Sequence, residues 1–244
     1  MAYTDIDDPS AYFQTTLYTG NGSNDLSITN GGNSDLQPDF VWIKQRDSRD
    51  HFLFDSVRGV LKYMASNETY PEDTLSDGLK SFNSNGFTID DAIGINENND
   101  PHVSWNWKAG TSFTNDASST GIGTIDSTGS VNTDAGFSIT TFTGTGSAGS
   151  VAHGLGAIPK FLVVKSRSNA NGWIVYHGSL GAGKGISLNL TDAAFSTGSR
   201  WNSTEPTSTV FSLGTAADVN RSGGTHVCYA FAEKKGYSKF GSYT

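Results

Sequence analysis

The sequence has few charged residues and a single cysteine. Asp, Glu, Lys and Arg together make up 16% of the 244 residues, and Cys228 is the only cysteine. One cysteine cannot form a disulfide within the chain, which excludes disulfide-rich scaffolds and all-thiolate zinc sites. No motif supplies another set of metal ligands or a cofactor site, so we expect no cofactor.

Long apolar runs are also missing. No stretch approaches the roughly 20 apolar residues that a membrane-spanning helix needs, and residues 1–8 contain acids and no apolar segment of a signal peptide. The formal net charge of −8 repels a phosphate backbone. We therefore expect no membrane insertion, no secretion signal and no nucleic-acid partner.

Turn-forming residues are abundant. The chain has 29 Gly and many Ser, Thr, Asn and Asp, while 35% of the residues are hydrophobic. Glycine and short polar residues stop helices and make turns, and this apolar content is enough for packed cores. The composition predicts an all-β fold of many short strands.

Three segments recur in the same order along the chain. Residues 13–23 align with 137–147, 38–46 with 159–167, and 102–107 with 226–231. The first and third pairs share one offset (137 − 13 = 124), and the gaps between segments fall in turn-like sequence. Ordered recurrence of this kind predicts an internal repeat.

The repeat predicts two tandem homologous β-sandwich units, jelly-roll-like, at residues 1–110 and 137–244. A Ser/Thr/Gly-rich connection at 111–136 joins them, and Ile122, Ile125 and Val131 suggest that part of it adds a strand. Residues 240–244 resemble the opening strand of a third copy. We expect them to close the second unit, and truncation of a longer array is the alternative.

Two segments carry strand signals. Residues 102–107 alternate, which places His102, Ser104 and Asn106 on one face and the aromatic side chains on the other. Residues 56–66 have apolar residues at helical spacing. Their counterpart at 179–190 has three glycines before alternating Ile and Leu, so the repeat predicts a loop and then a strand in both.

Two motifs resemble a nucleotide-binding site and a catalytic site. Residues 178–185 match a phosphate-binding loop up to Lys184, but Gly185 stands where Ser or Thr is needed and a strand is expected to follow; we favour a turn. His51, Asp55 and Ser56 are close in sequence, whereas triads join separate elements, so we favour chance proximity. No catalytic residue is assigned.

Three further sets of polar residues each have a structural interpretation that we favour over a functional one. Residues 96–100 are expected to form a hairpin turn, with a calcium site as the alternative. His102 and His226 occupy the same repeat position, and structural polar contact is favoured over metal binding. Cys228 is expected to be a packed side chain and not a nucleophile.

Trp201 and Asn202 lie in a loop-like, Ser/Thr-rich stretch. An exposed indole beside amide and hydroxyl groups suits a sugar ring, and amphipathic aromatics also suit protein interfaces. These two residues are the candidate contacts for a host glycan or a partner protein, and local packing is the third possibility for the indole.

Six short motifs together resemble a repeat of virion proteins from marine tailed phages, including phages of cyanobacteria. They are residues 6–10 (IDDPS), 17–23 (LYTGNGS), 37–44 (QPDFVWIK), 54–59 (FDSVRG), 104–110 (SWNWKAG) and 236–244 (GYSKFGSYT). The resemblance spans nearly the whole chain. It implies a place in the phage particle and transfers no catalytic residues.

The expected function is therefore that of a non-enzymatic bacteriophage virion structural protein, made in the host cytoplasm and located on the particle surface. A capsid decoration or accessory subunit is favoured, because no heptads of a trimeric tail-fibre stalk occur. The alternative is a tail-fibre or receptor-binding module for host surface glycan. Expected partners are other virion proteins and copies of the chain in a homo-oligomer.

Overall fold

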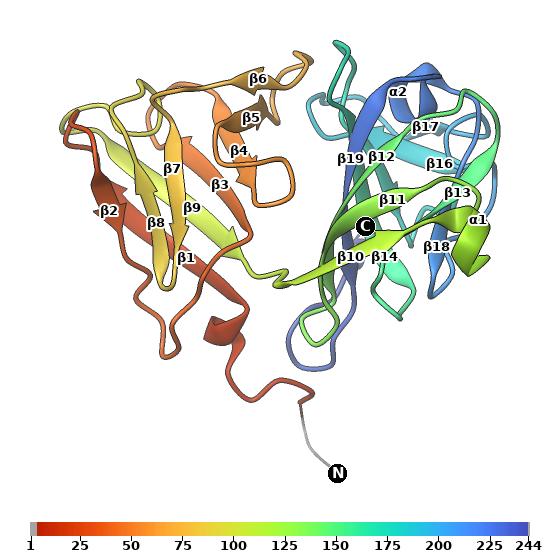
Figure 1. The fold of residues 1–244 in the computed structure, drawn as a ribbon, viewed down its shortest axis with the longest axis horizontal. Coiled ribbons are helices and arrows are strands. Elements are labelled where there is room, and N and C mark those ends of the chain that lie inside the picture. Colours follow the sequence, from red (N-terminus) through yellow and green to blue (C-terminus); the bar gives the residue numbers. More distant parts are fainter. Residues whose placement is uncertain (1–3, 244) are drawn as a thin grey trace. The chain divides into compact units, whose positions relative to one another are not determined.

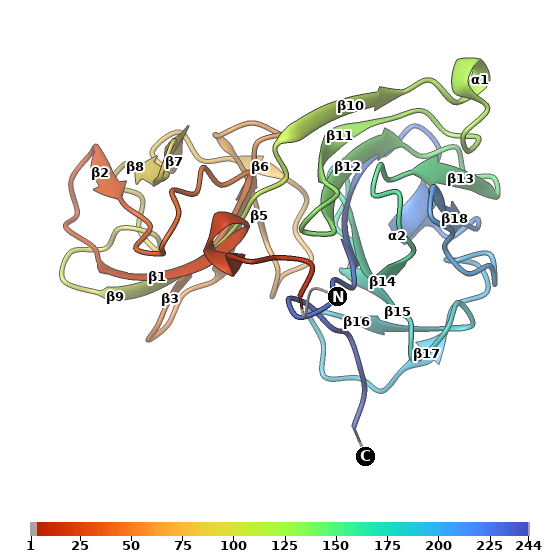
Figure 2. The ribbon, with the colours of Figure 1, turned by 90° about the horizontal axis from the view of Figure 1, so that it is seen from below.

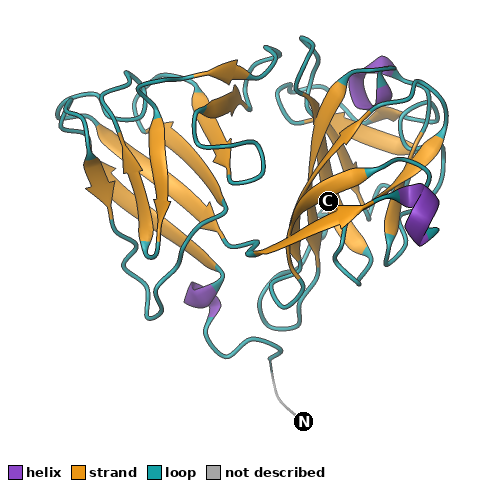
Figure 3. Cartoon of the chain, viewed as in Figure 1, coloured by secondary structure: helices purple, strands orange, loops and turns teal. Residues whose placement is uncertain are grey.

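The computed structural model describes residues 4–243. The protein is all-β, with antiparallel sheets and, in the described part, three helical segments of three or four residues: η1 (Pro9–Ala11), α1 (Ala117–Thr120) and α2 (Ala217–Asn220) (Figure 3). None of the described helices is long and apolar enough to cross a membrane. The chain forms two compact units, the N-terminal unit (Asp7–Gly110) and the C-terminal unit, which combines the described residues before Asp7 with those from Thr111 onward.

The N-terminal unit is a two-layer sandwich. Its strands are β1 (Phe13–Thr19), β2 (Leu26–Ile28), β3 (Phe40–Gln45), β4 (His51–Asp55), β5 (Lys62–Ala65), β6 (Asp73–Thr74), β7 (Leu79–Asn83), β8 (Gly86–Ile89) and β9 (Pro101–Trp107). One layer has the order β1-β9-β3-β4-β5-β6 and the other β2-β8-β7. Figures 1 and 2 show the shorter layer facing β1, β9 and β3.

The C-terminal unit contains a larger sheet and a two-stranded one. Its strands are β10 (Thr111–Asn115), β11 (Ser127–Asn132), β12 (Phe137–Thr143), β13 (Gly149–Ala152), β14 (Pro159–Ser166), β15 (Ile174–His177), β16 (Lys184–Ser187), β17 (Phe195–Ser196), β18 (Val210–Leu213) and β19 (Thr225–Ala232). The large sheet has the order β10-β11-β12-β19-β14-β15-β16-β17, and β13 pairs with β18.

The two units share a strand order. β1-β9-β3-β4-β5-β6 in the first corresponds in sequence to β12-β19-β14-β15-β16-β17 in the second, and β2-β8 to β13-β18. Four successive strands are neighbours in each large sheet, and this meander differs from the two Greek keys of a jelly roll.

Residues 111–136 are not a separate connection. They form β10, α1 and β11, which extend the C-terminal sheet beyond β12. The strand suggested by Val131 is present as β11, and Ile125 makes a single bridge to Val151. The predicted boundary at 137 is therefore wrong, because antiparallel pairing with β12 makes this segment part of the unit.

Strand β9 alternates as expected, but its polar face is the buried one. His102, Ser104 and Asn106 are all 0% exposed, whereas Trp105 and Trp107 are half-buried. The Asn106 amide donates to the Gln14 carbonyl (3.3 Å) and to the Ser104 hydroxyl (3.1 Å). These bonds offset part of the desolvation of the buried polar groups.

A buried carboxamide in the N-terminal unit connects two loops, the one after β1 and the one between β8 and β9. The Asn96 side chain, 0% exposed, accepts from the Asn21 N–H (2.8 Å) and donates to the carbonyls of Ser23 (2.8 Å) and Asp90 (2.9 Å). The turn after β1 passes so close that a Cβ on Gly20 would lie 2.2 Å from a backbone oxygen. Glycine is therefore required there.

Asn220 makes the same bonds in the C-terminal unit. Its buried side chain accepts from the Thr145 N–H (2.8 Å) and donates to the carbonyls of Ser147 (2.7 Å) and Gly214 (2.7 Å). Each partner lies 124 positions after its counterpart (145 − 21 = 124). A Cβ on Gly144 would likewise lie 2.4 Å from a backbone oxygen.

Two further strand predictions have different outcomes. Residues 56–66 form turns followed by β5, and residues 179–190 form turns followed by β16, so the loop-then-strand prediction is confirmed. No strand forms over residues 240–243, and the closing-strand prediction is wrong for them; residue 244 lies outside the described part. The Phe240 ring instead stacks on Phe161, with centroids 5.8 Å apart.

We predict that Asn96→Ala lowers the free energy of unfolding by about 2–4 kcal/mol, because the three hydrogen bonds of its buried side chain to backbone groups are lost. Urea denaturation followed by circular dichroism measures the change. The exposed neighbour Asn98 gives the matched control Asn98→Ala, which should shift stability by no more than about 0.5 kcal/mol. Equal effects of the two variants would contradict a structural role for the carboxamide.

Candidate functional site

A pocket rich in hydroxyl groups lies in the C-terminal unit, with a volume of about 300 Å³. It is built by β10, β11 and β12, by the loops beside them, and by the two neighbouring segments after β14 and at the start of β19. The lining residues are Thr114, Asn115, Asp116, Asp126, Ser127, Thr128, Thr141, Phe142, Thr143, Arg167 and Thr225.

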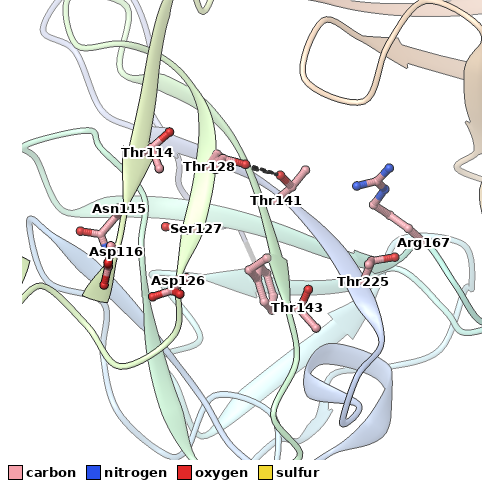
Figure 4. A pocket seen from close by; sticks show the side chains of 11 residues that line it. Thr114, Asn115, Asp116, Asp126, Ser127, Thr128, Thr141, Thr143, Arg167 and Thr225 are labelled. Atoms are coloured by element: carbon pink, nitrogen blue, oxygen red, sulfur yellow. Dashed lines mark hydrogen bonds between the residues drawn. The ribbon is translucent and has the colours of Figure 1, made fainter. Parts of the chain in front are cut away.

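The side chains are arranged by charge along the pocket. Figure 4 shows Asp116 and Asp126 at one end, Arg167 at the other, and Thr128 and Thr141 between them. The hydroxyls of Thr128 and Thr141 are 3.1 Å apart and bond each other. The Thr141 hydroxyl also donates to the Thr128 carbonyl (3.2 Å), so the hydrogens of both hydroxyls have partners in the protein and this middle part offers lone pairs that can accept from a ligand.

Both carboxylates bind backbone groups of the same loop. Asp116 caps α1, accepting from the N–H groups of Ser118 (3.0 Å) and Ser119 (3.1 Å), and Asp126 accepts from the Ala117 N–H (2.9 Å). Hydrogen bonds from the hydroxyls of Ser118 and Ser119, with smaller effects from their N–H groups, hold the pKa of Asp116 below its usual value. The two acids therefore fix the shape of this end of the pocket.

This geometry does not favour glycoside hydrolysis by the acidic pair. That reaction needs one carboxyl group with a raised pKa that can protonate the leaving oxygen. The pKa of Asp116 is lowered, and Asp126 binds a backbone N–H. The arrangement is suited to binding a neutral polyhydroxylated ligand through several hydrogen bonds.

Trp201 is buried, and the prediction of an exposed indole is wrong. Its side chain is 1% exposed within the hydrophobic core, where it packs edge-on against Tyr176 with centroids 6.1 Å apart. The backbone N–H of Trp201 donates to the Thr197 carbonyl (3.2 Å). Asn202 is exposed with a φ of 51°. Of the three interpretations of the indole, local packing is the one that agrees with its burial.

The remaining candidates each have local partners. Residues 178–182 form turns, and β16 begins at Lys184 where a phosphate-binding loop needs a helix, so the turn prediction is confirmed. Asp55 is buried and bonds Arg58, while the His51 Nδ1 accepts from the Trp42 indole at 2.8 Å. With Asp55 and His51 directed to different partners, His51, Asp55 and Ser56 form no triad.

Residues 96–100 contain a turn, but the predicted hairpin turn is wrong, because the flanking strands β8 and β9 lie in different sheets. The Asn96 carboxamide is used by the loops, and the Glu97 carboxylate forms an ion pair with Arg49 at 2.9 Å. Over residues 4–243, no group of three or more His, Cys, Asp or Glu side chains is placed to hold a metal ion.

The two equivalent histidines have the same surroundings, and their predicted structural role is confirmed. His102 bonds the Asp100 carbonyl through Nδ1 (2.9 Å) and stacks on Tyr18. His226 bonds the Gly224 carbonyl (3.0 Å) and stacks on Phe142, on the wall of the pocket. Cys228 is fully buried, which raises the pKa of its thiol, so it is a packed side chain as expected.

Sequence reasoning missed the pocket because its residues are widely separated. Thr128 and Asp116 lie in the stretch interpreted as a connection, and Arg167 and Thr225 come from other strands' ends. One local signal was present: Asp116 followed by Ala, Ser and Ser is a typical helix N-cap. It indicated ordered structure within that stretch.

A family model described as "Domain of unknown function (DUF7483)" matches residues 8–244. The chain therefore belongs to this family. Comparison with curated proteins and with solved structures found no match.

We predict that acid weakens the fold through His226. Burial lowers the pKa of His226 to about 4, against an ordinary value of 6.5. Between these values the unfolded chain binds more protons than the folded one, so the free energy of unfolding falls as pH drops through this range, by up to about 3 kcal/mol.

Urea denaturation at about pH 7 and about pH 5 measures this loss. The variant His226→Asn keeps a polar group near the Gly224 carbonyl but has no proton to bind, and it should lose less stability than the parent between the two values. An equal loss in both proteins would contradict the prediction.

Proposed function

We propose that this member of the DUF7483 family is a non-enzymatic structural protein of a bacteriophage particle. It is displayed on the particle surface as a decoration or accessory subunit and is built from an internal duplication. Its partners are other virion proteins and further copies of itself.

The equivalent bonds of Asn96 and Asn220 are the observation that carries the duplication. The three partner groups, two on the loop after the first strand and one on the segment that carries the asparagine, lie at the same offset in both units. The shared strand order agrees with them. Duplication of a unit held by buried loop contacts suits a protein whose role is to present surfaces, and the resemblance of its motifs to phage virion repeats points to the particle.

The low content of charged residues and the excess of acidic over basic residues support a surface subunit. The net charge of −8 favours solubility and disfavours contact with packaged nucleic acid. The buried carboxamides and histidines are structural, and the acids of the pocket bind backbone groups. These features support presentation and binding in place of catalysis.

Labelling of intact particles tests the proposal. An antibody against this chain, imaged by electron microscopy on particles of the phage that encodes it, should label the capsid surface, and mass spectrometry of purified particles should detect the chain in many copies. Label confined to the tail would overturn the decoration role, and absence of the chain from purified particles would overturn the virion assignment.

A second candidate function is recognition of host surface glycan, favoured by the hydroxyl-rich pocket. Its size and its mixture of donors and acceptors suit one or two sugar residues. In this candidate function the hydroxyl-rich pocket, and not Trp201 and Asn202, is the place of glycan contact.

We predict that the double variant Thr128→Val, Thr141→Val loses glycan binding by about tenfold or more on a glycan array, because two hydroxyl partners disappear without a change in side-chain shape. Valine retains the β-branched shape that strands favour, so the fold should be unchanged. Thr74→Val, on the exposed strand β6, is the matched control. Glycan binding that survives the double variant would place recognition elsewhere.

A further inference from the structure

Strand β1 is an edge of the large sheet in the N-terminal unit. Among residues 4–243 its only strand partner is β9. The Lys108 N–H donates to the Tyr12 carbonyl at 3.0 Å. Because backbone groups alternate in direction along an antiparallel strand, those of Phe13, Thr15 and Leu17 point away from β9.

The corresponding edge in the C-terminal unit is covered. Strand β12 corresponds to β1, and β11 pairs with it from Ser127↔Phe142 to Asn132↔Phe137. Strand β10 then pairs with β11. The same framework therefore accepts an antiparallel hairpin along this edge.

A groove of about 480 Å³ runs along the uncovered β1 edge. It is lined by β1 and by the loop after β2: Ser10, Phe13, Gln14, Thr15, Thr16, Leu17, Thr29, Gly31 and Gly32. A Cβ on Gly31 would have no neighbour within 4 Å.

The equivalent space in the C-terminal unit is filled by the hairpin. Gly31 comes three residues after Ile28, which pairs with Phe87, and Gly154 comes three residues after Val151, which pairs with Phe211. A Cβ on Gly154 would lie 3.2 Å from Phe113 of β10 and 3.4 Å from Val131 of β11.

The β1 edge also lacks the features that protect edge strands. Its seven residues carry no charge, and Leu17 is 66% exposed. Natural proteins usually protect an edge with charged residues, proline or a bulge.

We propose that the β1 edge binds an antiparallel β-hairpin from another polypeptide chain, of the kind that β10 and β11 provide in the C-terminal unit. Main-chain hydrogen bonds give the affinity, as in other cases of strand addition. The groove selects an uncharged strand with a β-branched residue opposite Gln14 and glycine opposite Thr16.

This preference for particular residues is inferred from the edge of β12, which β11 covers in the C-terminal unit. Val131 stands opposite Ser138 and Gly129 opposite Thr140, the counterparts of Gln14 and Thr16. A Cβ on Gly129 would lie 2.1 Å from the Ile139 carbonyl oxygen and 2.7 Å from the Phe113 ring. Glycine is therefore needed for the hairpin to approach. This proposal does not depend on the virion role or on glycan binding.

A synthetic peptide of residues 110–133 tests the proposal on the full chain. Isothermal titration calorimetry should show saturable binding, and hydrogen exchange should slow at the amides of Phe13, Thr15 and Leu17. The same peptide with Gly129→Val should bind about tenfold more weakly or not at all.

The variant Leu17→Lys places a charge on the edge and should weaken peptide binding by about tenfold or more. Leu190→Lys, at a leucine that is 54% exposed in a loop-like segment, is the matched control. Both variants should keep the urea midpoint of the parent.

Three results would overturn the proposal. One is absence of saturable binding to a monomeric chain. Another is binding that Leu17→Lys leaves unchanged, which places the peptide elsewhere. The third is a dimer by light scattering that Leu17→Lys converts to monomer, because the occupant of the edge is then β1 of a second copy and not a hairpin.

Discussion

One buried carboxamide in each unit determines where the loops at one end of the sandwich lie. Asparagine offers an acceptor and two donor hydrogens on a short side chain. Asn96 and Asn220 each bind an N–H and a carbonyl of the loop after the first strand and a carbonyl of their own segment. Inside a protein such fully satisfied bonds are strong and specify a single arrangement. The turn after the first strand of each unit is held by this arrangement.

The same framework carries different interiors. In the N-terminal unit the buried face of β9 presents Ser104 and Asn106, and the Asn106 amide bonds Ser104 and the neighbouring strand β1. In the C-terminal unit the corresponding positions of β19 are Cys228 and Ala230, which join an apolar core. The framework tolerates this exchange because the loop contacts and backbone pairing do not depend on those side chains. Variation of this kind leaves the exposed surfaces available for different partners.

The addition of one hairpin distinguishes the two units. Strands β10 and β11 cover the edge of β12 and also form one wall of the hydroxyl-rich pocket. Where the hairpin is missing, the N-terminal unit has a groove and an uncharged edge. A single structural difference therefore produces a polar pocket in one unit and an open strand edge in the other.

The sequence by itself determined the all-β class and several local elements. Alternation over residues 102–107, the turn over residues 178–182, and the loop before β5 are local properties, set by side-chain spacing and by glycine, and all are found in the structure. The repeat offset also anticipated the equivalent positions of His102 and His226, because pairing register follows the hydrophobic pattern.

Only the tertiary structure decided which side chains are buried. Alternation separates two faces but does not say that the polar face of β9 is buried, and a loop-like sequence did not reveal that Trp201 fills the core. The Ser/Thr-rich stretch before Phe137 became a hairpin because β12 offered an edge to pair with. Burial and pairing depend on residues far away in the chain, and for this reason local sequence patterns do not determine them.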